Sequence, residues 1–289
     1  MKQHLPEKKI FDIKVSNITK QELLEEIAQL VKIKKHAYVV TPYSEFIGFA
    51  KEDSNFAKII NQADISIADG VGISLALKYQ KLPGIYWPML KCLSALVLNR
   101  KYFTEEIKEK LSGSEAIYYV SEFAAKKGLS IFFLGGFDFG KGNTGDLAAE
   151  KLKEMYPKLK IAGAYAGSPS KDEESKIIKK INAAKPDLLY IAYGPRKQEA
   201  WIYRNKDKLK PCVSFCLGGS FDFVSGEKKR VPKWAAKNGL EGVLRPFFSE
   251  RGNIKLIIKR IQRGWVGMYR FVKILIAEKK SKNRCATTP

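Results

Sequence analysis

Short apolar runs alternate with longer stretches of helical periodicity along most of the chain. The apolar runs have the length of strands and end at glycine, proline or aspartate. They predict strands at 36–42, 63–70, 129–136, 160–167, 186–194 and 211–219. The stretches between them predict helices at 46–62, 71–80, 114–128, 145–157 and 171–185. This alternation predicts an α/β fold with a Rossmann-like, mostly parallel sheet and helices on both faces.

The last part of the chain follows a different pattern. The alternation stops after residue 239, and residues 254–276 have the periodicity of a helix with a basic side and an opposite apolar side. The basic side holds Lys255, Lys259, Arg263, Arg270 and Lys273, and the apolar side holds Ile257, Ile258, Ile261, Trp265, Met268, Val272 and Leu275. Such a helix suits an anionic membrane surface; the alternative is a helix packed on the core with a solvated basic face. We predict an α/β domain at 1–240 and a basic, membrane-associating helical appendage at 241–289.

The charge of the chain narrows the range of partners. Its 289 residues include 52 Lys and Arg against 30 Asp and Glu, a net charge of +22, and 45% of them are hydrophobic, enough for a sizeable core. The charge excess implies an anionic partner: a nucleic acid, a nucleotide or an acidic membrane surface. No nucleic-acid-binding signature accompanies it, so we expect no nucleic acid partner, and a basic nucleic-acid-binding protein is kept as an alternative.

The N-terminus and the cysteines indicate a compartment. The first residues lack the apolar segment of a secretory signal, and no run reaches the ~20 clean apolar residues of a spanning helix. The four cysteines have no metal-ligand spacing, and Cys212 and Cys216 lie in a predicted strand, as reduced core residues do. We expect a cytoplasmic protein, peripheral at the inner face of the cell membrane.

Candidate chemistry gathers where the predicted strands end. Ligands of parallel sheets bind beyond the carboxyl ends of the strands, where this chain has Asp69-Gly70, Gly135-Gly136, Gly194-Pro195 and Gly218-Gly219. Asp69 could act there as a general base towards a sugar hydroxyl or bind a ribose. Equally, it could be the N-cap of the following helix.

A second polar group opens the helix after residue 194. The polar side chains there, before an apolar anchor, could hold an anionic or hydroxyl-rich ligand: Arg196, Lys197, Gln198 and Glu199. The alternative is an ordinary solvated first turn. The chain has no Asp-x-Asp pair and only two histidines. We therefore predict no metal site and no cofactor, with Arg and Lys stabilising any leaving pyrophosphate.

Four ordered segments carry a family resemblance: TPYSEF (41–46), NQADISIADGVG (61–72), YGPRKQEAWI (193–202) and GGSFDFVSGEKKRVPKWAAKNGLE (218–241). Together they resemble the WecG/TagA/CpsF family of glycosyltransferases, from about residue 11 to about residue 259. The resemblance implies an inverting, metal-independent transferase at the cytoplasmic membrane face. Its members move an N-acetylhexosamine, typically N-acetylmannosamine, from a UDP-sugar to a polyprenyl-diphosphate-linked sugar in cell-surface polysaccharide synthesis.

The resemblance also implies roles for residues at matching positions. Asp69 matches the general base that deprotonates the acceptor hydroxyl, Thr41 a residue of the same pocket, and Gln198 a glutamine near the donor. Arg245 matches an arginine that contacts the diphosphate. Further substrate-binding candidates are Tyr43, Gly70, Lys110, Gly136, Gly194, Lys197 and Arg251.

Several positions depart from the family pattern. Tyr43 stands where the family has an asparagine, and Lys110 where it has an arginine. Two later arginines of the family correspond to Gly252 and Lys255, and the nearby Arg251 could take over such a role. These changes bear on the donor sugar more than on the fold or reaction class. An inactive relative that has lost its donor site is the alternative function.

Residues 82–103 exceed the family pattern and are rich in Trp, Leu and Tyr. We interpret this insert as an added membrane or lipid-chain contact; the alternative is an extra helical hairpin on the core. The resemblance is compatible with a homo-oligomer but does not set the number of copies.

Overall fold

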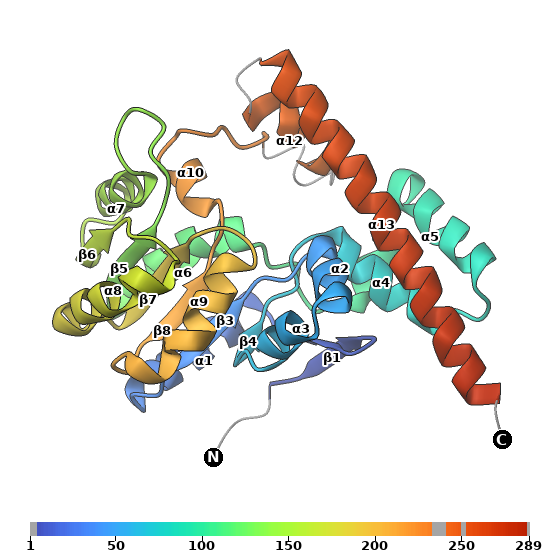
Figure 1. Ribbon diagram of the computed structural model, residues 1–289, viewed down its shortest axis with the longest axis horizontal. Coiled ribbons are helices and arrows are strands. Elements are labelled where there is room, and N and C mark those ends of the chain that lie inside the picture. Colours follow the sequence, from blue (N-terminus) through green and yellow to red (C-terminus); the bar gives the residue numbers. More distant parts are fainter. Residues whose placement is uncertain (1–4, 233–240, 250–252, 288–289) are drawn as a thin grey trace.

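The structure, a computed structural model, describes residues 5–232, 241–249 and 253–287 (Figure 1). Its centre is a six-stranded sheet in the order β4-β3-β8-β7-β5-β6, in which every neighbouring pair is parallel. The strands are β3 (Ala37–Val40), β4 (Ile65–Ser66), β5 (Ser130–Gly135), β6 (Lys160–Tyr165), β7 (Leu188–Ala192) and β8 (Val213–Cys216). All six predicted strands are present, and the predicted parallel α/β fold is confirmed.

The strand side chains alternate between two apolar cores, as the two-residue period of a strand requires. In β7, Leu189 and Ile191 belong to the main core, and Leu188 and Tyr190 to the second core. The main core is covered by α2 (Ser44–Glu52), α3 (Ser54–Asn61), α4 (Val71–Lys81), α8 (Lys171–Ala184) and α9 (Lys197–Asn205). The second is covered by α1 (Lys20–Lys32), α6 (Gly113–Lys127), α7 (Thr144–Met155) and α10 (Ser220–Val224). Helices therefore cover both faces of the sheet.

Two local features differ from the predicted pattern. The helix predicted at 46–62 is two helices, because the Asp53 carboxylate accepts hydrogen bonds from the N–H groups of Asn55 (3.0 Å) and Phe56 (3.1 Å) and caps α3. Near the N-terminus the chain forms an antiparallel hairpin, β1 (Glu7–Ile10) and β2 (Ile13–Ser16), which the sequence pattern did not predict.

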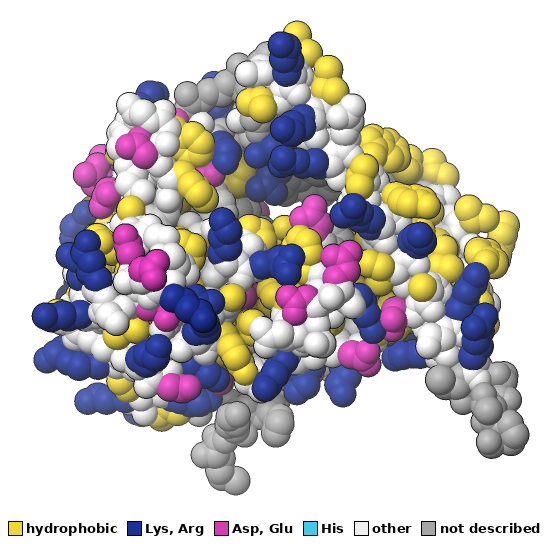
Figure 2. Space-filling view, in the orientation of Figure 1, with side chains coloured by type: hydrophobic (Ala, Val, Ile, Leu, Met, Phe, Trp, Pro, Cys, Tyr) yellow, Lys and Arg dark blue, Asp and Glu magenta, His cyan; other side chains and the backbone are white. Residues whose placement is uncertain are grey.

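The chain leaves the neighbouring strands β3 and β8 towards opposite faces of the sheet. After β3 it enters α2 on the main core, and after β8 it enters α10 on the second core. Diverging continuations of adjacent parallel strands are the usual place for a ligand in such sheets. Figure 2 shows that the surface is hollowed below the upper part of α13, with Lys and Arg side chains on the rim.

The predicted insert forms α5 (Tyr86–Leu98) and part of the 3₁₀ helix η1 (Arg100–Glu106). One side of α5 enters the main core through Met89, Cys92 and Ala95. The buried Glu106 carboxylate of η1 pairs with the Lys81 ammonium of α4 (2.7 Å). The insert is thus held on the core, as one of its two interpretations expects, while the other side of α5 is exposed.

The C-terminal region comprises α12 (Glu241–Ser249) and the long α13 (Ile254–Thr287). In α13, Phe271 and Leu275 are buried in the main core. The buried Lys279 ammonium donates hydrogen bonds to the carbonyl oxygens of Tyr79 (2.6 Å) and Leu82, at the end of α4. A cation there complements the negative end of the helix dipole. This half of α13 therefore matches the core-packed alternative.

The first half of α13 is different, because large apolar side chains such as Ile254 and Trp265 are exposed there. Among the described residues, no helix has the length and apolar character needed to cross a membrane. The predicted division at residue 240 adjoins residues 233–240, which are outside the described part of the chain, and it stays a prediction.

Replacing Leu275 by alanine tests whether α13 belongs to the core. Leu275 is fully buried, so Leu275→Ala is expected to lower the free energy of unfolding by about 3 kcal/mol, measured by urea denaturation. Leu256→Ala is the matched control on the same helix, because Leu256 is 45% exposed; it is expected to change stability by less than about 0.5 kcal/mol. Equal effects of the two substitutions would contradict the packing described.

Candidate active site

The Asp69 carboxylate, beyond the end of β4, faces the start of α6. Its Oδ2 accepts a hydrogen bond from the backbone N–H of Gly113 (3.1 Å), the first residue of α6. The Asp69 N–H donates to the carbonyl of Pro42, beyond β3 (2.9 Å). The N-cap of α4 is Gly70. One alternative was that Asp69 caps the helix that follows it, but Gly70 holds that position. The Asp69 carboxylate instead faces the positive end of another helix, α6.

Thr41 lies at the same corner. Its hydroxyl donates a hydrogen bond to the carbonyl oxygen of Cys216, the last residue of β8 (3.3 Å). A Cβ on Gly113 would lie 3.0 Å from the Thr41 Oγ1, so a glycine lets α6 begin this close to β3. Thr41, Asp69 and the N-terminus of α6 thus lie together at the carboxyl edge of the sheet, and we call this group the strand-end site.

Gln198 joins the strand-end site from α9. Its side-chain oxygen accepts a hydrogen bond from the N–H of Gly218, just beyond β8 (3.0 Å), and its side-chain nitrogen donates to Oε1 of Glu199 (2.7 Å). Glu199 is fully buried, and its Oε2 has no hydrogen-bond partner within the described residues. Burial raises the pKa of Glu199 to about 7, against the hydrogen bond from Gln198, which lowers it. The sequence pattern places Glu199 among the polar residues that open this helix, but it does not predict the burial of the carboxyl group, which is a property of the packed helix.

Three predicted glycines occupy left-handed backbone conformations at the same edge. Gly70, Gly136 and Gly194 have φ of 84°, 95° and 85°, a region in which glycine is favoured. A Cβ on Gly136 would lie 2.6 Å from the backbone nitrogen of Gly145, so this glycine lets β5 meet the start of α7. Among the described residues, no atom lies within 4 Å of the place that a Cβ on Gly70 would take, and Gly70, the N-cap of α4, is partly exposed beside Asp69. Backbone N–H groups at helix N-termini favour anionic ligands.

Tyr43 and Arg245 approach the strand-end site from opposite ends of the chain. The half-buried Tyr43 donates its hydroxyl hydrogen to Glu45 (3.0 Å). Burial raises the pKa of Tyr43, the carboxylates of Glu45 and Glu199 add to the rise, and the charge of Arg245 opposes it. The Arg245 guanidinium lies 4.9 Å from the ring centre of Phe223 in α10. Tyr43 is therefore within electrostatic reach of both Glu199 and Arg245.

The remaining predicted residues are not joined to this group by the contacts described. Lys110 is exposed, three residues before Gly113. Lys197 is exposed and lines a separate cavity. Arg251 lies outside the described residues.

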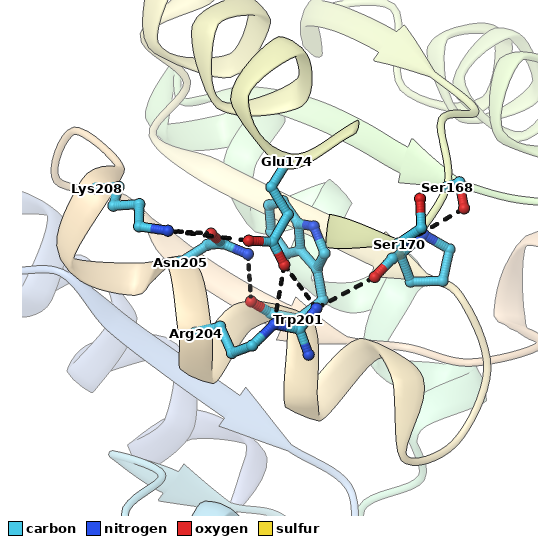
Figure 3. Close-up of polar contacts among 8 residues, drawn as sticks. Ser168, Ser170, Glu174, Trp201, Arg204, Asn205 and Lys208 are labelled. Atoms are coloured by element: carbon cyan, nitrogen blue, oxygen red, sulfur yellow. Dashed lines mark hydrogen bonds and ion pairs between the residues drawn. The ribbon is translucent and has the colours of Figure 1, made fainter. Parts of the chain in front are cut away.

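That cavity, of about 460 Å³, is bounded by α3, α9 and the loop after β6. Both of its arginines are already paired: Arg196 with Asp53 (3.1 Å) and Arg204 with Glu174 (2.6 Å). Figure 3 shows Arg204 between Glu174 and the loop that carries Ser168 and Ser170. Burial raises the pKa of Glu174, but hydrogen bonds from Arg204 and Asn205 outweigh it and leave the pKa below its usual value. Because these charges are satisfied within the protein, the strand-end site is the better candidate.

Another buried carboxylate ties α10 to α7 near the strand-end site. Asp222 pairs with the Lys228 ammonium (2.5 Å) and accepts a hydrogen bond from the hydroxyl of Thr144 (3.4 Å). Asp222 was not among the predicted site residues, and the sequence spacing contains no signal for its contact with Thr144. The contact fixes the start of α7 against the turn that follows β8.

The cysteines and acidic side chains form no group with the arrangement of metal ligands within the described residues. Cys212 and Cys216 are buried and free, as expected for reduced core residues, and so is Cys92. In the part of the chain that the structure describes, no three His, Cys, Asp or Glu side chains are grouped to hold a metal ion. That the reaction needs neither a metal nor a cofactor stays a prediction.

The raised pKa of Glu199 predicts a pH-dependent stability. The unfolded chain ionises Glu199 near its ordinary value of 4.5, and the folded chain only near 7, so stability is lost as the pH rises through this range. Glu199→Gln keeps an oxygen for Gln198 and removes the ionisation. By urea denaturation, this variant is expected to match the unmodified protein near pH 4.5 and to exceed it by up to about 3 kcal/mol at pH 8. Glu150→Gln, at an exposed position of α7, serves as control, and a pH-independent difference for Glu199→Gln would contradict the argument.

Comparison with known proteins identifies the family. The glycosyl transferase WecG/TagA/CpsF family model matches residues 8–85 and 94–283. An N-acetylglucosaminyldiphosphoundecaprenol N-acetyl-beta-D-mannosaminyltransferase of Staphylococcus aureus strain MRSA252 is 24% identical over 275 residues, covering 94% of this chain and 95% of the relative. The enzyme of the same name from Staphylococcus aureus strain NCTC 8325 is 23% identical, with the same coverage of both chains. Because the family model matches nearly the whole chain, this protein belongs to the WecG/TagA/CpsF family of glycosyltransferases.

Proposed function

We propose that the protein transfers N-acetylmannosamine from a UDP-sugar to a polyprenyl-diphosphate-linked N-acetylglucosamine, with inversion and without a metal ion. The observation that carries this proposal is the Asp69 carboxylate beside Thr41 and the first residue of α6, in a chain that belongs to a glycosyltransferase family. The named relatives transfer this sugar to this kind of acceptor. The product serves the synthesis of a cell-surface polysaccharide.

Asp69 acts as the general base in this proposal. A single displacement inverts the sugar: the acceptor hydroxyl attacks the anomeric carbon, its proton passes to Asp69, and the bond to the UDP oxygen breaks. The N–H of Gly113 holds one carboxylate oxygen in a fixed direction, so the base is oriented before the substrate binds. Thr41 and Gln198 fix the neighbouring backbone of β8 and its turn.

The leaving UDP carries the negative charge that forms in the reaction. The partly exposed N-terminus of α4 lies beside Asp69, and the N–H groups of a helix N-terminus favour an anion. Arg245 adds a full positive charge within electrostatic reach of Tyr43. Groups arranged in advance around a developing charge lower the barrier without a metal ion.

The basic side of α13 supports a position at the inner face of the cell membrane. Lys255, Lys259 and Arg263 are exposed on the first half of α13, and anionic lipid attracts basic groups close to its surface. The second half of α13 is buried in the main core through Phe271 and Leu275. Deleting the appendage would therefore uncover the core. Replacing exposed basic side chains is the better test of the membrane contact.

Asp69→Asn tests the base. Asparagine retains an oxygen for the Gly113 N–H but cannot take up the proton, so transfer is expected to fall roughly 10²–10⁴-fold with unchanged urea denaturation. UDP release from UDP-N-acetylhexosamines is measured in EDTA, with and without a lipid-diphosphate-sugar acceptor. Asp172→Asn, exposed on α8, is the matched control. A fully active, folded Asp69→Asn protein would overturn the assignment.

Neutralising the basic side of α13 tests the membrane contact. With Lys255, Lys259 and Arg263 all changed to glutamine, partitioning onto phosphatidylglycerol vesicles is expected to fall about 100-fold at low salt, since each charge near the surface contributes about 1 kcal/mol. The control replaces the exposed Lys126, Lys127 and Lys151 of α6 and α7, which changes the net charge equally. Equal losses would mean that only total charge matters.

A further inference from the structure

The outer side of α5 is an apolar face in contact with solvent. Trp87, Val97 and Leu98 are 77%, 80% and 83% exposed, and Tyr86 and Leu90 are more than half exposed. At about 100° per residue these five side chains fall within roughly 120° of the helix, opposite the buried Met89, Cys92 and Ala95. A face of this size is unusual for an unpartnered surface. Figure 2 shows hydrophobic side chains gathered over α5.

A second apolar stripe on α13 is turned towards the same side. Ile254, Ile258, Trp265 and Tyr269 are all exposed, and they lie within roughly 60° of one another around the helix. Further along this side of α13, Lys280 lies 4.9 Å from the ring centre of Tyr86 in α5. The stripe therefore leads along α13 to α5, and Figure 1 shows the two helices running beside each other.

The charges around this combined surface favour one occupant. Residues 86–98 and 254–277 contain Lys and Arg but no Asp or Glu. Tryptophan and tyrosine beside aliphatic and basic side chains are typical of segments that lie in the interface of an anionic bilayer. The family model leaves residues 86–93, the first turns of α5, unmatched.

We propose that the outer face of α5 inserts into an anionic bilayer together with the Trp265 stripe of α13, as a second membrane contact beside the basic side of α13. The proposal rests on the proposed function, because a lipid-linked acceptor requires the strand-end site to meet the membrane. The buried contacts of α13 at Phe271, Leu275 and Lys279 join this surface to the sheet. Two helices on the bilayer also restrict the orientation of the site, which one helix alone does not.

The test replaces Trp87, Leu90, Val97 and Leu98 together by serine in the full chain. Partitioning onto phosphatidylglycerol–phosphatidylcholine vesicles, measured by sedimentation, is expected to fall about 100-fold, because several large apolar side chains no longer enter the lipid. The loss is expected to persist at high salt, which screens charges but not apolar insertion. The control replaces Ile33 and Met155, which are exposed elsewhere on the molecule, and is expected to change partitioning less than twofold. Unchanged partitioning of the α5 variant would overturn the proposal.

A second measurement excludes another copy of the chain as the occupant. Light scattering without vesicles is expected to give the same molar mass for the α5 variant and the unmodified protein. A lower molar mass for the variant, with partitioning unaffected, would assign the face to self-association and overturn the membrane contact.

Activity separates this inference from the proposed function. On a water-soluble acceptor with a truncated lipid the α5 variant is expected to keep its transfer rate, and on a polyprenyl acceptor in vesicles it is expected to lose most of it. Loss on both acceptors, in a folded variant, would overturn a membrane role for α5. If the unmodified protein transferred sugar to neither acceptor, the proposed function would fail, and the vesicle measurement would still decide the role of α5.

Discussion

The parallel pairing of β3 with β8 is the contact on which the site depends. In this pair Tyr38 lies opposite Ser214 and Val39 opposite Phe215, although the two strands are far apart in the chain. The pairing places Thr41, beyond β3, against the end of β8, and it brings the turn at Gly218 within reach of Gln198. A shift of one residue would turn the side chains of a strand to the wrong core, so the two apolar cores hold this register.

The strand-end site contains polar groups that only this packing could hold. Burying a carboxyl group is costly unless hydrogen bonds replace its water, and within the described part of the chain Glu199 receives such a bond at Oε1 but not at Oε2. Both ends of the Gln198 amide are hydrogen-bonded: its nitrogen donates to Glu199, and its oxygen accepts from the N–H of Gly218. The raised pKa of Glu199 is the physical sign of that burial.

The long helix α13 links the sheet to the outer surface. Its second half is fixed by apolar burial and by the Lys279 ammonium at the end of α4, and its first half projects with exposed basic and apolar side chains. A continuous helix transmits orientation along its length. The contacts in the core therefore determine where the exposed half points relative to Asp69.

The sequence by itself determined the strands, most helices, the parallel sheet and the edge at which Asp69, Thr41 and Gln198 lie, because these follow from local periodicity and from the motifs of one family. It could not distinguish a cap from a site carboxylate at Asp69, nor a core-packed from an exposed α13. The tertiary structure shows that Gly70 is the N-cap of the following helix and that Gly113, from a distant helix, donates a hydrogen bond to Asp69. It also shows that one half of α13 is buried while the other is not. The burial of Glu199 was equally beyond the sequence, and of the insert at 82–103 the sequence left open whether it contacts a membrane or packs on the core. Burial and hydrogen-bond partners depend on residues far apart in the chain, and periodicity describes only neighbours.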